Sequence, residues 1–296
     1  MTAIPTISTT PEGVTIEPRD RKFDFNTALA TDWFGNDPFL TAVFNALSIS
    51  FPTGEKEFID SIRHYEDRIQ DEKLLSEIRG FCRQEGIHSR EHRQYNRELC
   101  NARGYDLDEL ESVYIAMLKK VKSNPRVTSR IRLASTLALE HFTAGLAEVL
   151  MKTSYMDEAD PAVRELWLWH SMEEMEHKSV AYDVYVQVGG DYVMRKRIMR
   201  LAMLILARSM VKNTTRMLRQ DKQLWRWKTL KSATTFFFGK TGLVRQYLPH
   251  HREFFRKDFH PWDADTRDLL EQWKPRLAGS PGRRVAGSPD HRVTEA

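Results

Sequence analysis

Residues 166–177 read LWLWHSMEEMEH, and this stretch decides how the chain can fold. In a helix, steps of three and four residues bring His170, Glu174 and His177 onto one face. The same face is apolar before and after them, from Val163 to Val184, so it should pack into a core. Burying a carboxylate and imidazoles without partners is costly, so these side chains must find partners in the interior.

A second Glu-x-x-His pair lies in the predicted helix 72–103. The apolar stripe that starts at Leu74 continues, at helical spacing, through Glu85, His88 and His92. This helix therefore repeats the pattern of the first one, and its polar residues also face the interior.

Two further helices each contribute one inward glutamate. Glu140 interrupts the apolar stripe of one helix, and His141 follows it. In the other helix, Glu55 lies on the apolar side, whereas Glu57 shares a face with charged residues and should face water. We take Glu55 as the site residue and keep Glu57 as its alternative.

These residues form a recognisable ligand set. One Glu from each of two helices and one Glu-x-x-His from each of two others is the pattern of ferritin-like di-iron and di-manganese proteins. Four carboxylates balance about two divalent cations, and oxygen with imidazole donors suits iron or manganese better than tetrahedral zinc. We predict two iron ions, with manganese as the alternative, held by Glu55, Glu85, His88, Glu140, His170, Glu174 and His177.

Helical periodicity dominates the chain between its ends, and breaks fall at Pro and Gly. We predict an all-α protein, a ferritin-like four-helix bundle with additional N- and C-terminal helices. Residues 1–20 are expected to form a disordered arm and residues 279–296 a disordered tail; residues 35–275 form the helical domain, including a basic extension over 192–275. The predicted helices span 38–50, 54–69, 72–103, 107–121, 126–152, 160–188, 192–220, 222–236 and 264–274.

Composition excludes several classes of protein. Hydrophobic residues make up 41% of the 296 residues, which excludes global disorder, and two cysteines exclude a disulfide framework. No signal-peptide pattern is visible at the N-terminus, and the longest apolar run, 201–207, is too short to span a membrane. We expect a cytoplasmic protein, and the sequence leaves oligomer formation open.

The segment 192–232 is strongly basic. It contains twelve Lys and Arg residues and one acid, Asp221, so it carries +11 in a chain of net charge +4. The segment could be a bundle helix with a solvated basic face, or a membrane-surface contact over 192–238 that draws an apolar substrate from lipid. Nucleic-acid binding is less favoured, because no recognised reading motif accompanies the charge.

Four short motifs carry a resemblance to a known family: FPTGE at 51–55, QEGIHSREH at 84–92, YN at 95–96 and DFHPWD at 258–263. With these motifs the sequence resembles a bacterial family labelled predicted metal-dependent hydrolases, over roughly residues 35–275. That label implies hydrolysis, and the ligand order places the family within the wider ferritin-like di-iron superfamily.

A narrower resemblance concerns one helix. His170-x3-Glu174-x2-His177 looks like the last ligand helix of the di-iron arylamine N-oxygenases, and this resemblance implies that His170 is a third histidine at an oxygen-activating site. His92 and His141 are expected to hydrogen-bond a ligand carboxylate. His141 could instead be a plain core residue.

Three functions fit this reasoning. The favoured one is an oxygen-activating oxidoreductase that acts on an apolar or aromatic small molecule and takes electrons from an external donor. The alternative is a metal-dependent hydrolase that uses a metal-bridging hydroxide. The third is a metal-binding bundle without enzymatic activity.

Overall fold

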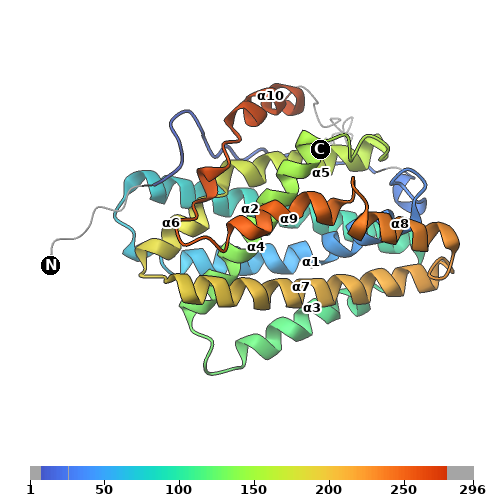
Figure 1. Ribbon diagram of the computed structural model, residues 1–296, viewed down its shortest axis with the longest axis horizontal. Helices are drawn as coiled ribbons and strands as arrows, with labels where there is room; N and C mark the ends of the chain where they lie inside the picture. The colour runs from blue at the N-terminus through green and yellow to red at the C-terminus, as the bar shows by residue number, and fades with distance from the viewer. Residues whose placement is uncertain (1–7, 26, 279–296) are drawn as a thin grey trace, which may run out of the picture.

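The computed structural model describes residues 8–25 and 27–278, and this part of the chain is helical with no β-strand, which confirms the all-α prediction (Figure 1). Four of the helices contribute the predicted site residues. The helices are α1 (Pro38–Arg63), α2 (Glu72–Arg103), α3 (Leu107–Lys122), α4 (Ser129–Lys152), α5 (Pro161–His177), α6 (Val180–Gln187), α7 (Tyr192–Gln220), α8 (Trp227–Phe238), α9 (Leu243–Glu253) and α10 (Arg267–Ala278).

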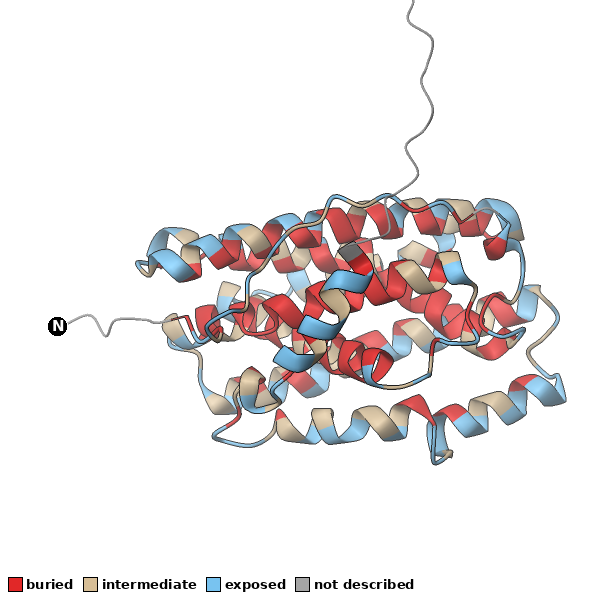
Figure 2. Cartoon of the chain, turned by 90° about the horizontal axis from the view of Figure 1, so that it is seen from above, coloured by how far each residue is buried: buried red, intermediate tan, exposed pale blue. Residues whose placement is uncertain are grey.

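The four site helices pack as a closed ring, in which α1 contacts α2 and α4, and α5 contacts the same two helices. Helix α7 covers α1 and α4 on the outside, α3 packs on α7, and α10 lies against α5 on the opposite side (Figure 1). Buried residues line the inner faces of the bundle, and exposed residues line the outer faces (Figure 2). The interior of this ring is where the polar stripes meet.

Most helices start where the sequence predicts. The side chains of Asp37, Asp71, Asp106 and Asp191 each accept a hydrogen bond from a backbone N–H of the first turn that follows. Asp160 caps α5 in the same way, with Pro161 in the first turn. These caps set the register that points the site residues inward.

The predicted break at Pro52 is wrong, because α1 runs through it as one helix. Proline has no N–H to give to the carbonyl four residues earlier, which here is the carbonyl of Ser48. The side chain of Asn96 on α2 donates to that carbonyl at 3.0 Å, so the freed acceptor is satisfied. Ser89 also donates to the carbonyl of Pro52, at 3.2 Å. Neighbouring side chains thus make an interior proline tolerable.

The C-terminal half differs from the prediction in two places. The expected single helix over 160–188 is broken after His177, where Lys178 turns away to bond the carbonyl of Ala264 at 2.7 Å. Helix α9 was not predicted, because Gly242 precedes it and Pro249 lies inside it, and both residues suggest a loop. None of the helices in the described residues has the length and apolarity that a membrane span requires.

The N-terminal segment, expected to be a disordered arm, is ordered where the structure describes it. Residues 8–20 lie along the bundle, and the hydroxyl of Ser8 donates to Glu77 at 2.6 Å. Thr9 donates to Asp183 through both its backbone N–H and its hydroxyl. Residues 1–7 and the predicted tail 279–296 lie outside the described residues.

Candidate metal centre

The structure brings all seven predicted ligands together inside the helical ring. Each is buried, with at most 3% of its surface exposed. Helix α1 supplies one, α2 two, α4 one and α5 three. We call this set the carboxylate–histidine cluster; its members are Glu55, Glu85, His88, Glu140, His170, Glu174 and His177.

Two groups of donor atoms converge within the cluster, each close enough to hold one ion. Ligand atoms of Glu85, His88, Glu174 and His177 lie within 4.8 Å of one another, and so do those of Glu55, His88 and His170. Nε2 of His177 lies 3.2 Å from Glu85 Oε1, and its Nδ1 lies 3.1 Å from Glu140 Oε2. The shared residue, His88, lies between the two groups.

Many polar atoms of the cluster have no hydrogen-bond partner, although buried polar atoms normally do. These are both carboxylate oxygens of Glu55 and of Glu85, one oxygen of Glu140, Nδ1 of His88 and Nε2 of His177. Each of these atoms can offer a lone pair, and all of the residues that carry them except Glu140 belong to the two converging groups. Unpaired acceptors that face one another are what a cation would satisfy, so the donor set fits metal ions.

The charge of the cluster leads to the same conclusion. No Lys or Arg in the described part of the chain forms an ion pair with Glu55, Glu85, Glu140 or Glu174. Burial, followed by the charge of Glu85, raises the pKa of Glu55 well above its usual range. Burial alone would lower the pKa of His88, but its carboxylate neighbours raise it to about 10. Without metal, protons carry the compensating charge, so metal ions and protons compete for the same atoms.

Glu173, which is ion-paired with Arg19, orients His88 from outside the cluster. Nε2 of His88 lies 3.0 Å from Oε2 of Glu173, and Arg19 bonds the other oxygen of Glu173 at 3.2 Å. Since the ion-paired Glu173 can only accept, Nε2 must carry the imidazole proton. When the ring is neutral, as a metal ligand must be, the lone pair of Nδ1 faces Glu85 at 3.7 Å. This is the carboxylate–histidine arrangement that holds metal-binding imidazoles.

The same arginine also neutralises a second buried acid. Arg19 bonds Glu176 at 2.9 Å, Lys274 of α10 approaches it to 3.0 Å, and Gln84 donates to it at 2.8 Å. Glu173 and Glu176 are thus matched by two cations, from the N-terminal segment and from α10. Their charges are balanced outside the cluster, and the four inner carboxylates are left for the metal.

A chain of hydrogen bonds sets the proton positions on the other side of the cluster. Asn96 donates through Nδ2 to the carbonyl of Ser48, so its Oδ1 accepts from the Ser48 hydroxyl at 2.7 Å. Because the Ser48 hydroxyl already donates its proton to Asn96, its oxygen accepts a hydrogen bond from Nδ1 of His92 at 2.9 Å. Nε2 of His92 then accepts from Nδ1 of His170 at 2.8 Å.

This chain leaves the lone pair of Nε2 on His170 directed inward, 2.8 Å from Oε1 of Glu174. Burial lowers the pKa of His92 and of His170, so both rings are neutral and each carries one proton. Two lone pairs face each other across this short distance, which requires a proton or a cation between them. The orientation of His170 therefore suits a metal ligand.

The other three candidates, His92, Glu57 and His141, lie outside the set of seven ligands. His92 bonds a histidine of the cluster, and not a carboxylate as expected. Glu57, the alternative to Glu55, lies outside the cluster and pairs with Arg132 at 2.9 Å. His141 turns away from the cluster: its Nε2 donates to the carbonyl of His250 at 2.7 Å. Its ring packs on aromatic side chains there, as an interhelix residue does.

Acid should destabilise the fold through His141. Burial lowers its pKa to about 3, below the usual value near 6.5, so the unfolded chain binds more protons between these values. The stability that neutral His141 contributes is complete above pH 6.5 and is lost as the pH falls toward 3. At about 1.4 kcal/mol per pH unit, the loss by pH 5 reaches up to about 2 kcal/mol.

Urea unfolding of the chelator-treated protein at pH 7.5 and pH 5 measures this effect. The variant His141→Gln keeps a donor for His250 and should lose up to about 2 kcal/mol less than the parent between the two pH values. Equal losses in parent and variant would show that His141 does not titrate in this way.

Sequence reasoning missed the residues that support the cluster. Glu173 and Glu176 stand beside Glu174 and His177 in the same acidic run, and this run was the available signal. Nothing local marks Arg19 as a site residue, because Glu173 and Glu176 lie more than 150 residues away along the chain. The link from Asn96 to Ser48 likewise exists only once α1 and α2 are packed.

Comparison with known proteins adds one finding. The model of a family described as "Predicted metal-dependent hydrolase" matches residues 17–265. This range includes every residue of the cluster together with Arg19. Searches of curated proteins and of solved structures found no match to the chain.

Proposed function

Since the chain belongs to the family of predicted metal-dependent hydrolases, we propose that it binds two divalent cations in the carboxylate–histidine cluster and catalyses hydrolysis. The main support is the set of four buried carboxylates that no Lys or Arg of the described residues balances. Their charge corresponds to about two divalent cations. The family description supplies the reaction class.

The two groups of donor atoms suggest how the ions are shared. Glu85, Glu174 and His177 would hold one ion, with Glu140 beside His177. Glu55 and His170 would hold the other, and His88 lies between them. The mixture of carboxylate oxygens and neutral imidazoles favours iron or manganese, and the ligand order is that of the ferritin-like proteins.

Bound cations supply Lewis acidity, which polarises a carbonyl or phosphoryl oxygen and makes a water molecule acidic at neutral pH. The chain itself orients the donors. Glu173 holds the proton of His88 at Nε2, and His92 holds His170 in the tautomer whose Nε2 faces the cluster. The ring centroid of Phe51 lies 4.7 Å from that of His92 and 4.9 Å from that of His170. This apolar ring limits the access of water on that side.

The test is a hydrolysis assay under nitrogen and without a reductant. Protein loaded with manganese or zinc should turn over members of a panel of carboxylic and phosphoric esters. Glu174→Gln should abolish this turnover, whereas the matched change Glu57→Gln, outside the cluster, should retain it. Protein that holds its metal and hydrolyses none of the panel would refute the proposal for these substrates.

Oxygen activation is the second candidate, and one observation favours it. The cluster contains a third histidine, His170, in a site that is rich in carboxylates and closed to solvent. In that case the iron-loaded, chemically reduced protein should consume dioxygen, and the zinc-loaded protein should be inert toward esters. Both assays start from the same metal-free protein, loaded with manganese, zinc or iron, so one series of measurements distinguishes the candidates.

A further inference from the structure

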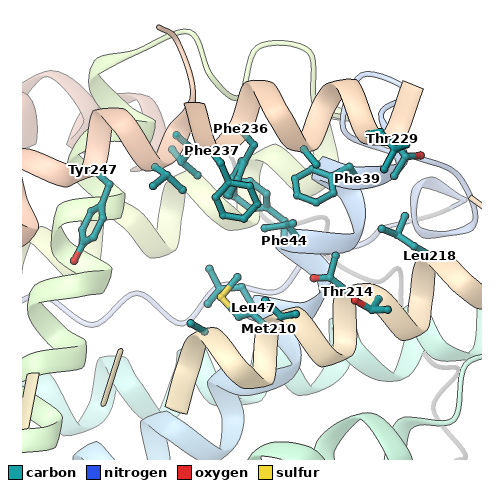
Figure 3. A pocket seen from close by; sticks show the side chains of 18 of the residues that line it. Phe39, Phe44, Leu47, Met210, Thr214, Leu218, Thr229, Phe236, Phe237 and Tyr247 are labelled. Atoms are coloured by element: carbon teal, nitrogen blue, oxygen red, sulfur yellow. The ribbon is translucent and has the colours of Figure 1, made fainter. Parts of the chain in front are cut away.

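An apolar cavity of about 350 Å³ lies outside the helical ring, between α1, α4, α7, α8 and α9. Phe39, Phe236 and Phe237 face it from one side, and Met210 and Leu218 of α7 face it from the other (Figure 3). Its volume is in the range of small-molecule sites and more than twice that of an engineered cavity that binds benzene. A space of this kind suits a hydrocarbon group.

The mouth of the cavity is exposed on the surface that α7 and α8 form. Val211, Leu230 and Phe237 line the cavity, yet 60%, 40% and 43% of their surfaces are exposed. A shallow groove over the outside of α7 shares Ala207 and Val211 with the cavity. The interior space and the outer apolar surface are therefore continuous.

Large aromatic side chains project into solvent near this mouth. Trp225, Trp227 and Phe238 are 82%, 78% and 78% exposed, which is unusual for residues of this size. Contiguous exposed apolar surface indicates an interaction site, and tryptophan is enriched where proteins meet the boundary between lipid and water.

Basic side chains surround the same residues. The segment 192–232 carries +11, and its exposed cations make no ion pair within the described residues. A polar face of Lys and Arg beside exposed aromatic residues is the pattern of helices that lie on anionic lipid. These cations include Arg208, Lys212, Arg219, Lys222, Arg226 and Lys231.

The inner end of the cavity approaches the carboxylate–histidine cluster. Phe44 lines the cavity, and its ring centroid lies 4.9 Å from that of Trp167. Trp167 in turn contacts Phe51, whose ring lies against His170. Three aromatic rings in series, those of Phe44, Trp167 and Phe51, thus connect the wall of the cavity with the cluster.

We propose that the α7–α8 surface docks on anionic lipid and that the cavity takes up a hydrocarbon chain from that lipid surface. The charge of the surface selects the membrane, the exposed aromatic residues insert into it, and the mouth between α7 and α8 admits the chain. That this chain belongs to the substrate rests on the proposed function; docking and uptake do not depend on it.

Sedimentation with vesicles tests the docking. The full chain should bind phosphatidylglycerol vesicles and should bind phosphatidylcholine vesicles only weakly. Binding to phosphatidylglycerol should weaken as the salt concentration rises. The double variant Lys222→Gln/Lys231→Gln should weaken binding roughly tenfold or more. The matched variant Lys22→Gln/Lys257→Gln, which removes two exposed charges elsewhere, should bind like the parent.

A second pair of variants separates aromatic insertion from charge. Trp225→Ala/Trp227→Ala should reduce vesicle binding at least tenfold, whereas Val186→Ala/Val193→Ala, also exposed apolar residues, should not. Equal binding to both vesicle types, no binding, or binding to duplex DNA in place of vesicles would overturn the docking proposal.

Uptake is measured with dansyl-undecanoic acid, whose fluorescence rises in apolar surroundings. The parent should bind it with or without a metal chelator, so this result is independent of metal and of hydrolysis. Ala233→Trp, which fills the cavity from α8, should reduce probe binding at least tenfold and leave vesicle binding unchanged. Unchanged probe binding in this variant would refute uptake into the cavity.

Discussion

Glu174→Gln should remove most of the metal from the protein, which we expect to carry about two iron or manganese ions per chain. A carboxylate oxygen of Glu174 lies within 4.8 Å of ligand atoms of Glu85, His88 and His177. Oε1 of Glu174 also lies 2.8 Å from Nε2 of His170. Glu174 would therefore hold one ion and would lie beside His170, a ligand of the other, and a neutral amide cannot replace its charge. Elemental analysis of protein purified without added metal gives the result directly, and Glu85→Gln should behave in the same way.

Without metal, the Glu174→Gln protein should be at least as stable as the parent. In the parent, four carboxylates are buried together, and the charge of Glu85 raises the pKa of Glu55. Removing one of these charges relieves repulsion, so metal-free Glu174→Gln should unfold no earlier on heating than the metal-free parent. The parent alone should then gain thermal stability when manganese is added.

Glu57→Gln is the control, because Glu57 pairs with Arg132 outside the cluster. It should retain the parent's metal content. A Glu174→Gln protein with full metal content would show that the ions bind elsewhere, and a Glu57→Gln protein without metal would show the same.

The cluster could be predicted because its information is local. Helical spacing alone places Glu85 with His88 and Glu174 with His177, and it also distinguishes Glu55 from Glu57. The structure buries Glu55 and leaves Glu57 in a surface ion pair. What spacing could not give is the distance between the two groups, which depends on how the four helices pack.

The errors arise where tertiary contacts override a local signal. Pro52 predicts a break, yet α1 continues because Asn96 of another helix satisfies the freed carbonyl of Ser48. Conversely, no Gly or Pro marks the end of α5, which stops where Lys178 reaches the carbonyl of Ala264. Each outcome is decided by a partner far away in the chain, so a single-sequence pattern contains no trace of it.

In the N-terminal segment, too, distant contacts override the local sequence signal, and here the error affects the site most. Its composition suggests disorder, but Arg19 reaches the bundle and bonds both Glu173 and Glu176. Its side chain is only 15% exposed, and both acids are fully buried. A segment without helical periodicity thus supplies the charge that sets the proton on His88.

Arg19→Met should therefore damage both the fold and the metal centre. Two buried carboxylates would lose their shared cation, and breaking a buried ion pair in this way costs about 3–5 kcal/mol. His88 would also lose the fixed acceptor that orients it, because Glu173 would now draw protons to itself. Metal affinity should fall roughly 10- to 100-fold, the usual effect of removing a residue that orients a ligand.

Two further variants separate charge from packing in urea unfolding and in manganese titrations. Arg19→Lys keeps the charge but not the two-pronged contact, so it should recover part of the stability. Glu176 keeps Lys274 as a partner, so Glu173 is the acid that is left without a cation. In Arg19→Met/Glu173→Gln this uncompensated charge is removed as well, and the double variant should be more stable than Arg19→Met alone. Arg19→Met with the parent's stability and manganese affinity would mean that the N-terminal segment covers the bundle without supporting the cluster.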